Sequence, residues 1–263
     1  MLSTLLLFSA LAAATPAAAP AAAPAAIAPT REQIEAQRYR HCLDLAATKP
    51  GEAISYAIDW RVNGGGVPSR QCLGLAYLTQ KDYPAAIAAF ESAARAAEVA
   101  KSPQTAALWG QAGNTALLAG DPKRALGFFN SGLAAAGDTG AERPELLIDH
   151  GRAAVELGDL DAARADIAKA VAIDPESGDG WLLTATIERS AGNLPAAEAA
   201  ILKAGKLLPG DIDVALEAGN IAFTQGKLKL ARAAWDAIVK VAPTDPAGVE
   251  AARLLKEHPD TAG

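Results

Sequence analysis

The chain has 263 residues, of which 51% are hydrophobic but only 5% are aromatic, and alanine is by far the most frequent residue. Because alanine is the best helix former and adds little bulk, this composition predicts an all-α fold and argues against a β-sandwich or barrel, which needs more β-branched and aromatic residues. The 24 Lys and Arg against 30 Asp and Glu give a net charge of −6, so we expect no nucleic-acid partner, since a phosphate-binding surface needs a net basic field.

Residues 1–19 have the pattern of a signal peptide. An apolar run from Leu2 to Ala14 is followed by small residues suited to cleavage between Ala14 and Ala19, although the usual Lys or Arg before the run is missing. The run stops at Pro16, short of the roughly 20 apolar residues of a membrane-spanning helix, so we expect no stable membrane insertion of the mature chain. The Ala/Pro-rich, acidic composition looks bacterial. We therefore predict export to the periplasm, with a cytoplasmic location as the alternative if this segment is not a functional signal.

An Ala/Pro-rich linker, residues 20–30, follows the signal. It carries no charge, and its prolines fix φ and remove hydrogen-bond donors, so we predict a disordered, extended spacer. Residues 31–66 then have helical spacing over 32–47 and 51–62. This spacing predicts an N-terminal helical hairpin, which we interpret as a degenerate repeat.

The strongest pattern in the chain is a repeat with a period of 34 residues. Three kinds of residue recur at this interval in three successive units. They are a turn glycine (Gly158, Gly192 and Gly226), a small residue (Ala163, Ala197 and Ala231) and a closing proline (Pro175, Pro209 and Pro243). The glycine can adopt the left-handed conformation that ends the first helix of a unit, and the alanine lets the two helices approach closely. The proline prevents continuation of the second helix. The pattern predicts a stack of helical hairpins.

This pattern resembles the tetratricopeptide repeat family, whose unit is a 34-residue helix–turn–helix with small residues at set positions and a terminal proline. Two upstream units carry the same pattern through Trp109, Gly113, Gly120, Asp121, Ala125 and Phe129, and through Leu73, Gly74, Tyr77, Asp82, Tyr83, Ala86, Ile87 and Phe90. The resemblance implies a right-handed superhelical solenoid of antiparallel helix pairs, with five repeats over residues 67–243. Extra residues in the first two units predict a longer second helix in the first unit and a Gly-containing loop after the second.

The C-terminal residues 244–263 are predicted to form a capping helix and a tail. Pro246 to Glu257 has helical spacing of its apolar residues, with Asp245 as the N-cap and Pro246 at the first helical position. A terminal repeat cannot bury its own apolar edge, so we expect this helix to cover the last repeat.

The two cysteines, Cys42 and Cys72, begin the similar segments CLDLA and CLGLA, which places them at similar heights on neighbouring helices. In an exported chain two cysteines are most simply a disulfide, and this pairing is our prediction. The alternatives are two buried, reduced thiols or a metal site. Although His41 is adjacent to Cys42, no CxxC or HxxxH spacing supports a metal, and we predict none.

No catalytic constellation is recognisable in the sequence. HExxH, GxSxG and Walker-type motifs are absent, so we predict no catalytic residues, no cofactor and no enzymatic activity. We interpret His150 as a satisfied core histidine and Trp109, Trp181 and Trp235 as core residues. Arg232 and its neighbour Asp236 look like a solvated outer face.

Function is therefore expected on the concave surface that stacked hairpins create. In the family the inner face of the first helices carries the ligand contacts. The resemblance assigns this role to Gln71, Leu75, Leu78, Asn114, Leu117, Leu118, Ile148, Arg152, Val155, Leu182, Thr186, Arg189, Leu216, Asn220 and Phe223. The mixture suits a peptide or helix held by apolar anchors and a few hydrogen bonds. The family's carboxylate clamp is not carried over, because Gly110 stands where it needs Lys. A merely solvated inner face is the alternative at each position.

Two hypotheses for function follow from these assignments. The first is a non-enzymatic scaffold that binds a protein or peptide of the bacterial cell envelope through its groove. The second is a regulatory or targeting subunit of a cell-envelope enzyme or export complex. The sequence leaves open the identity of the partner, whether it binds as an extended peptide or as a helix, and the oligomeric state.

Overall fold

The computed structural model describes residues 29–259, so the predicted signal peptide, nearly all of the predicted linker and the last four residues lie outside the description. Within residues 29–259 the chain forms thirteen α-helices and no β-strand. They are α1 Arg31–Thr48, α2 Pro50–Val62, α3 Gly66–Thr79, α4 Tyr83–Val99, α5 Thr105–Leu118, α6 Pro122–Ala136, α7 Arg143–Glu156, α8 Leu160–Ile173, α9 Gly178–Ser190, α10 Leu194–Leu207, α11 Ile212–Thr224, α12 Leu228–Val241 and α13 Pro246–Glu257. Over the same range, no helix is both long enough and apolar enough to cross a membrane.

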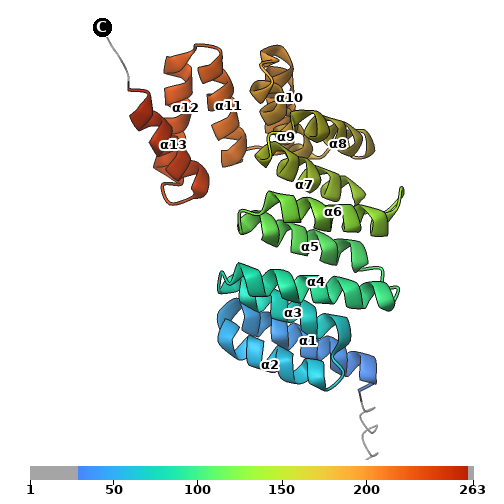
Figure 1. Ribbon diagram of the computed structural model, residues 1–263. Helices are drawn as coiled ribbons and strands as arrows, with labels where there is room; N and C mark the ends of the chain where they lie inside the picture. The colour runs from blue at the N-terminus through green and yellow to red at the C-terminus, as the bar shows by residue number, and fades with distance from the viewer. Residues whose placement is uncertain (1–28, 260–263) are drawn as a thin grey trace, which may run out of the picture.

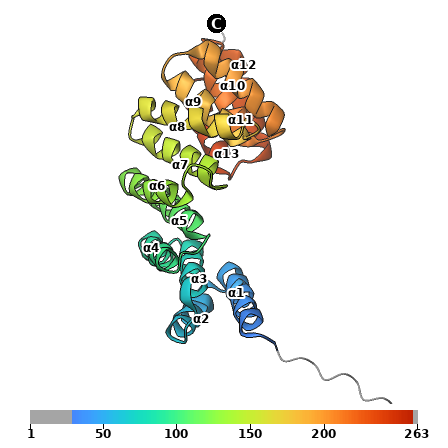
Figure 2. The same ribbon diagram turned by 90° about the vertical axis from the view of Figure 1, so that its right-hand side faces the viewer.

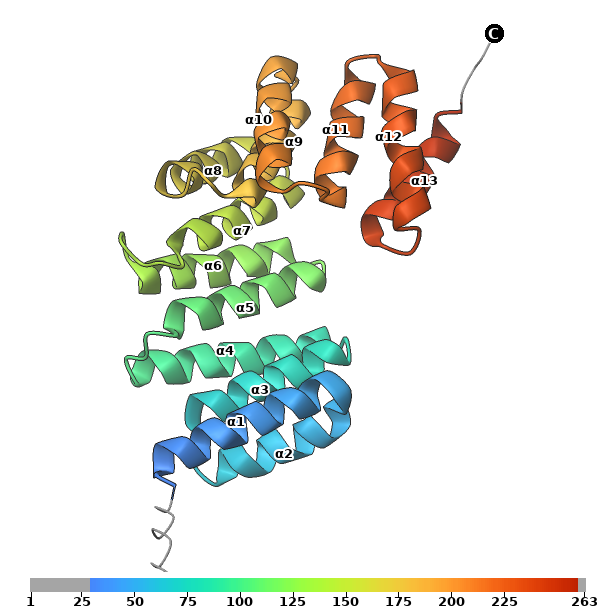
Figure 3. The same cartoon turned by 180° about the vertical axis from the view of Figure 1, so that it is seen from behind.

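Consecutive helices pack as antiparallel pairs that stack along the chain (Figure 1). The pairs from α1 to α8 lie as layers, and α10, α11 and α12 run at a steep angle to them (Figure 3). The stack therefore turns along its length, and α1 and α12 lie toward opposite ends of it (Figure 2). This architecture confirms the predicted all-α solenoid of antiparallel helix pairs. We call α3, α5, α7, α9 and α11 the first helices and α4, α6, α8, α10 and α12 the second helices of the five repeats.

The turn within each repeat is made by a residue in the left-handed region. Glycine takes this place in four repeats, with φ of 72° at Gly120, 79° at Gly158, 77° at Gly192 and 76° at Gly226. In the first repeat the residue is Lys81, with φ of 60°. These turns follow the family pattern because only glycine adopts positive φ without a steric penalty from Cβ.

In the first, second and fifth repeats, a large side chain of the second helix lies on a glycine of the first helix and holds the two together. Phe90, Phe129 and Trp235 are all at most 1% exposed, and a Cβ on the facing Gly74, Gly113 or Gly219 would lie 2.7, 2.3 or 2.7 Å from their ring atoms. One large ring packed against a glycine in each of these repeats explains how a chain with few aromatic residues fills its core.

The first two repeats contain the extra residues predicted for them. α4 has 17 residues, whereas α6 has 15 and α8 has 14. The segment between α6 and α7 contains Gly137 and Gly140. At the C-terminus, Asp245 precedes α13 and its side chain accepts a hydrogen bond from the backbone N–H of Ala247.

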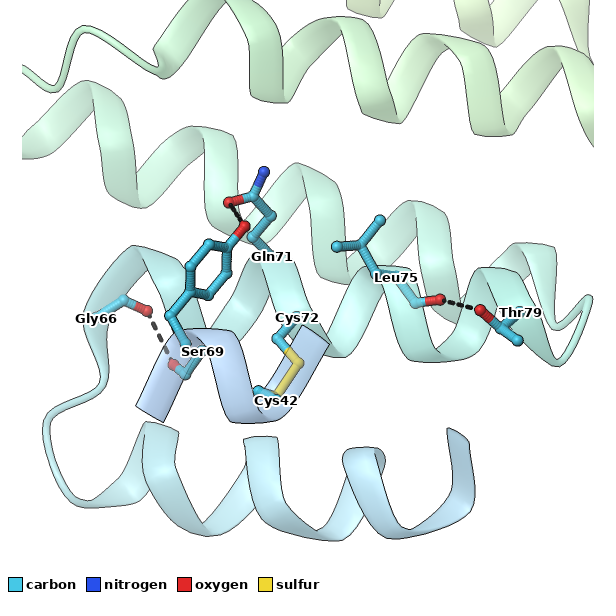
Figure 4. The surroundings of a disulfide bond; sticks show 8 residues. Cys42, Gly66, Ser69, Gln71, Cys72, Leu75 and Thr79 are labelled. Carbon is cyan, nitrogen blue, oxygen red and sulfur yellow. Dashed lines mark hydrogen bonds between the residues drawn. A yellow bond between two sulfur atoms is a disulfide. The ribbon is translucent and has the colours of Figure 1, made fainter. Parts of the chain in front are cut away.

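A disulfide between Cys42 of α1 and Cys72 of α3 attaches the N-terminal hairpin to the first repeat (Figure 4). Their Cα atoms are 6.1 Å apart, and both residues are fully buried. Cys72 shares α3 with Gln71, whose side-chain oxygen accepts a 2.8 Å hydrogen bond from the Tyr39 hydroxyl of α1. The structure thus pairs the two cysteines and contains no reduced thiol within the described range.

The structure corrects two interpretations of individual side chains. Trp181 is only partly buried: it packs against the core of the fourth repeat, but its indole N–H donates to the carbonyl of Pro175 and the Lys203 Nζ lies 4.2 Å from the ring centroid. Arg232 is not part of a solvated face. It is partly buried and donates hydrogen bonds to the carbonyls of Leu255 and His258 at the end of α13. In both cases the repeat period predicts which helix the residue belongs to, but contacts with a neighbouring segment determine how far its side chain is buried.

His150 has the partner that a core histidine requires. Its Nδ1 lies 2.7 Å from Asp166 Oδ2, and the His150 side chain is 16% exposed. Burial raises the pKa of the Asp166 carboxyl, but the hydrogen bond and charge of His150, together with Lys169, outweigh burial and hold that pKa below its ordinary value. This pair joins α7 to α8 within the third repeat.

Candidate partner-binding groove

The residues assigned to the groove all lie on first helices, and all except one are at least partly accessible. Ile148 is the exception, because it is only 5% exposed and packs in the core of the third and fourth repeats. A ligand on the surface would not reach it, and we leave it out of the groove. The other fourteen residues are called the inner groove below.

Several polar members of the inner groove bind side chains of a neighbouring repeat. At the N-terminal end, Gln71 accepts from Tyr39 and donates from its side-chain nitrogen to Gln111 Oε1 at 3.1 Å. This chain of hydrogen bonds connects α1, α3 and α5. The side chain of Gln71 therefore has a structural role in addition to any contact with a ligand.

The next link joins α5, α7 and α9 through a buried carboxylate. Asp149 is 4% exposed and accepts 2.8 Å hydrogen bonds from Asn114 and Arg152. Arg152 also lies 3.8 Å from an Asp179 carboxylate oxygen. The Asn114 amide nitrogen and part of the Arg152 guanidinium are thus already engaged, although we predicted them to bind a ligand main chain and a ligand carboxylate.

Arg189 makes the strongest contact between successive first helices. It donates two hydrogen bonds, of 2.6 and 3.1 Å, to the two carboxylate oxygens of Glu217 on α11. The exposed fractions are 24% for the Arg189 side chain and 8% for that of Glu217. A two-point guanidinium–carboxylate pair fixes orientation as well as distance, so it sets the angle between the fourth and fifth repeats.

The last repeat directs its inner residues toward the C-terminal cap. The side-chain oxygen Oδ1 of Asn220 accepts a hydrogen bond from the Trp235 indole N–H at 3.2 Å. The Phe223 ring lies 4.2 Å from the His258 ring and 5.7 Å from the Trp235 ring, measured between centroids. Phe223 keeps 36% of its surface exposed, so it offers a ligand one edge of its ring.

Apart from Leu118 and Phe223, the apolar members of the inner groove pack on one side against the core of their repeats. Leu118 is 60% exposed, and the others are partly exposed; they are Leu75, Leu78, Leu117, Val155, Leu182 and Leu216. Thr186 bonds only to the carbonyl of Leu182 in its own helix. The inner groove thus combines a row of accessible apolar side chains with polar side chains that hold the repeats in register.

A pocket of about 250 Å³ opens between α5 and α7, beside Asn114. Its lining includes Gly110, where the family's carboxylate clamp has Lys, and the carboxyl groups of Glu142, Glu145 and Asp149. No Lys or Arg lines this pocket within the described part of the chain. Because three carboxyl groups would repel a ligand carboxylate, this pocket does not suit the C-terminus of a peptide.

Carboxyl groups also gather where the later first helices begin. Burial, and then the neighbouring carboxylates of Asp211 and Asp245, raise the pKa of Asp213 above its ordinary value, which the charge of Arg152 partly offsets. The same edge includes Asp179, a further like charge that raises this pKa. Sequence reasoning missed Asp149, Asp213 and Glu217. In the sequence these three residues are marked only as acidic residues among the apolar residues of a first helix.

The tetratricopeptide repeat family matches the chain over residues 69–138 and 148–212, which together make up just over half of its 263 residues. The comparison with curated proteins found no match. Among solved structures, the type IV pilus biogenesis factor PilW is similar, with 16% identity and a TM-score of 0.65, and the match covers 82% of this chain and 96% of PilW.

Two further structures have similar folds. The Pseudomonas aeruginosa pilF protein has 12% identity and a TM-score of 0.62, over 85% of this chain and 99% of pilF. A tetratricopeptide repeat protein from Parabacteroides merdae has 18% identity and a TM-score of 0.63, over 84% of this chain and 89% of its own. At these identities the likeness is one of fold.

Proposed function

Because this chain belongs to the tetratricopeptide repeat family, we propose that it is a non-enzymatic scaffold that binds a protein or peptide of the bacterial cell envelope in its inner groove. The observation that carries the proposal is the row of partly exposed apolar side chains along successive first helices, from Leu75 to Leu216. Family members bind protein or peptide partners, and an apolar row of this kind supplies anchor contacts for a peptide or helix.

The hydrogen bonds between repeats support this function through preorganisation. Side chains such as Asp149 and Glu217 fix each first helix against the next before a partner arrives. A ligand then loses less of its binding free energy to ordering the groove. We expect the partner to bind through apolar side chains along its length, because the acidic pocket beside Asn114 does not suit a terminal carboxylate.

The envelope location rests on two features. The apolar segment within residues 1–19 has the length and small-residue ending of an export signal. The buried Cys42–Cys72 disulfide is typical of an oxidising compartment, such as the bacterial periplasm. Fractionation of cells that produce the full chain tests this location. Recovery of the chain in the periplasm, with its thiols protected from alkylation, supports export, whereas recovery in the cytoplasm with two free thiols contradicts it.

Affinity capture from envelope extract tests the groove. The most accessible apolar member is Leu118, so Leu118→Asp places a charge in the groove with little disturbance of the core. Val99→Asp is the matched control, because Val99 is 87% exposed at the end of a second helix, away from the groove. We expect Leu118→Asp to lose a captured protein that the wild type and Val99→Asp retain. Equal capture by all three chains contradicts the proposed groove.

A further inference from the structure

One position of the first helices differs in the last repeat from all the others. The residue four positions before the small residue of the first helix is Arg70, Trp109, Leu147 and Trp181 in the first four repeats, and Ala215 in the fifth. Four bulky side chains are thus followed by a single methyl group.

At two junctions a tryptophan in this position packs beside the second helices, although a pocket of about 730 Å³ still opens beside Trp181. Trp109 lies beside Phe128 of α6 and under Arg95 of α4, and it donates to Glu98 of α4. Trp181 packs similarly against α10, where Lys203 covers its ring. In the fifth repeat, Ala215 replaces Trp181 and Ala237 replaces Lys203, each 34 residues later in the chain. Both the tryptophan ring and the lysine that covers it are therefore absent at this position.

At this junction an apolar groove of about 590 Å³ opens between α10, α11 and α12, and we call it the outer groove. Ala215 and Ala218 of α11 line it together with Ala237 of α12. Two apolar side chains of its lining are largely exposed, Leu202 of α10 by 62% and Val241 of α12 by 75%. The second helices α10 and α12 stand on either side of α11 (Figure 3).

The charges along α10 identify the occupant that this surface fits. Glu198, Leu202 and Lys206 are spaced by four residues and are all exposed, so they share one face of the helix. If two α10 helices meet antiparallel about a two-fold axis near Leu202, Glu198 of each copy faces Lys206 of the other. The surface is therefore complementary to itself in charge, as a two-fold interface requires.

We propose that the outer groove is a self-association surface, in which two copies of this chain pair through antiparallel α10 helices. Leu202 of each copy packs against Leu202 of the other at the axis, beside the apolar lining of the outer groove, and two Glu198–Lys206 pairs form at the ends of the contact. The interface involves second helices, so both inner grooves remain free. The proposal is independent of what the inner groove binds.

Sedimentation velocity of the purified chain, over about 1 to 100 µM, tests the proposal. We expect a dimer whose fraction rises with concentration. Ala215→Trp installs the residue of the preceding repeat at the equivalent position, which places a bulky ring in the outer groove, and is expected to leave a folded monomer with an unchanged circular dichroism spectrum. A wild-type chain that is still monomeric at about 100 µM overturns the proposal, as does an Ala215→Trp dimer of wild-type affinity.

Charge exchange provides a second test that does not depend on Ala215→Trp folding. Glu198→Lys and Lys206→Glu each place like charges opposite one another at both ends of the contact, so each should weaken the dimer at least about tenfold. The double variant restores both pairs and should recover the dimer. Val99→Glu, at an exposed site of α4, is the control that should not change association. A dimer that is insensitive to the single exchanges overturns the proposal.

Discussion

Arg189 of α9 and Glu217 of α11 form a two-point ion pair, with N–O distances of 2.6 and 3.1 Å, between the first helices of two successive repeats. Glu217 is only 6% exposed. Together with the bonds that Asp149 accepts from Asn114 and Arg152, this pair shows that the inner surface is stabilised by polar contacts between repeats. These polar contacts fix the positions of the first helices, and with them the apolar side chains of the inner groove.

Arg189→Ala should destabilise the protein by about 2–4 kcal/mol, because it leaves the buried Glu217 carboxylate without its cation. Arg189→Lys keeps the charge but loses the two-point geometry, so its cost should be smaller. Urea unfolding monitored by circular dichroism measures both. The control is Arg253→Ala, whose side chain is 51% exposed and should cost less than about 0.5 kcal/mol. Equal costs at Arg189 and Arg253 would show that the inner pair is not structural.

Gly113→Ala should destabilise the second repeat, because the added Cβ would lie 2.3 Å from the buried Phe129 ring. We expect a cost of about 1–3 kcal/mol from this overpacking. Gly151 is the matched helical glycine of the third repeat, where the nearest atom to an added Cβ is 3.5 Å away. Gly151→Ala should be neutral or stabilise by up to about 1 kcal/mol, since alanine is the better helix former. A similar melting temperature for the two variants contradicts this account of the helix contact.

Replacing both Cys42 and Cys72 with Ala should loosen the N-terminal hairpin. The two cysteines are 30 residues apart in the sequence. For a loop of this length the entropic model gives a loss of about 3–4 kcal/mol in the free energy of unfolding. Because each repeat contacts only its neighbours, the effect should remain local. Hydrogen exchange should therefore become faster in α1 and α2 and remain unchanged in α11 and α12. A uniform increase along the chain would contradict this local role.

The pH dependence of stability should contain a contribution from Glu188. Hydrogen bonds from Arg164 and then from Asn193 lower the pKa of this carboxyl, with burial opposing them. Since the folded pKa lies below the unfolded value, the stabilisation is complete above the unfolded pKa and is lost as pH falls through the folded pKa. Glu188→Gln removes that acid-sensitive part. Unfolding free energies measured from pH 6 down to pH 3 should therefore fall less in the variant than in the wild type, and parallel curves would contradict the assignment.

The repeat period predicts the backbone of this protein better than its side-chain contacts. Gly158, Gly192 and Gly226 predict the turns correctly because a left-handed turn depends on the residue that makes it. The burial of Ile148 and the partial burial of Trp181 depend on the helices packed against them. Such tertiary contacts do not follow from a position within the repeat.

The polar contacts of the inner face are also beyond the reach of the sequence pattern. Asn114 and Asp149 are 35 residues apart, and Arg189 and Glu217 are 28 apart. Neither interval is the 34-residue period, so the repeat alone does not pair them. The stack brings them together through the rotation between successive repeats, which the structure supplies.

Site-specific photo-crosslinking in living cells tests the central claim most directly. A photoreactive amino acid replaces Leu118, which is 60% exposed in the inner groove, or Val99, which is 87% exposed outside it. We predict that irradiation links another protein to the chain from position 118 and not from position 99, and mass spectrometry of the adduct then identifies the partner. No adduct from position 118, or the same adducts from both positions, would contradict a partner-binding inner groove.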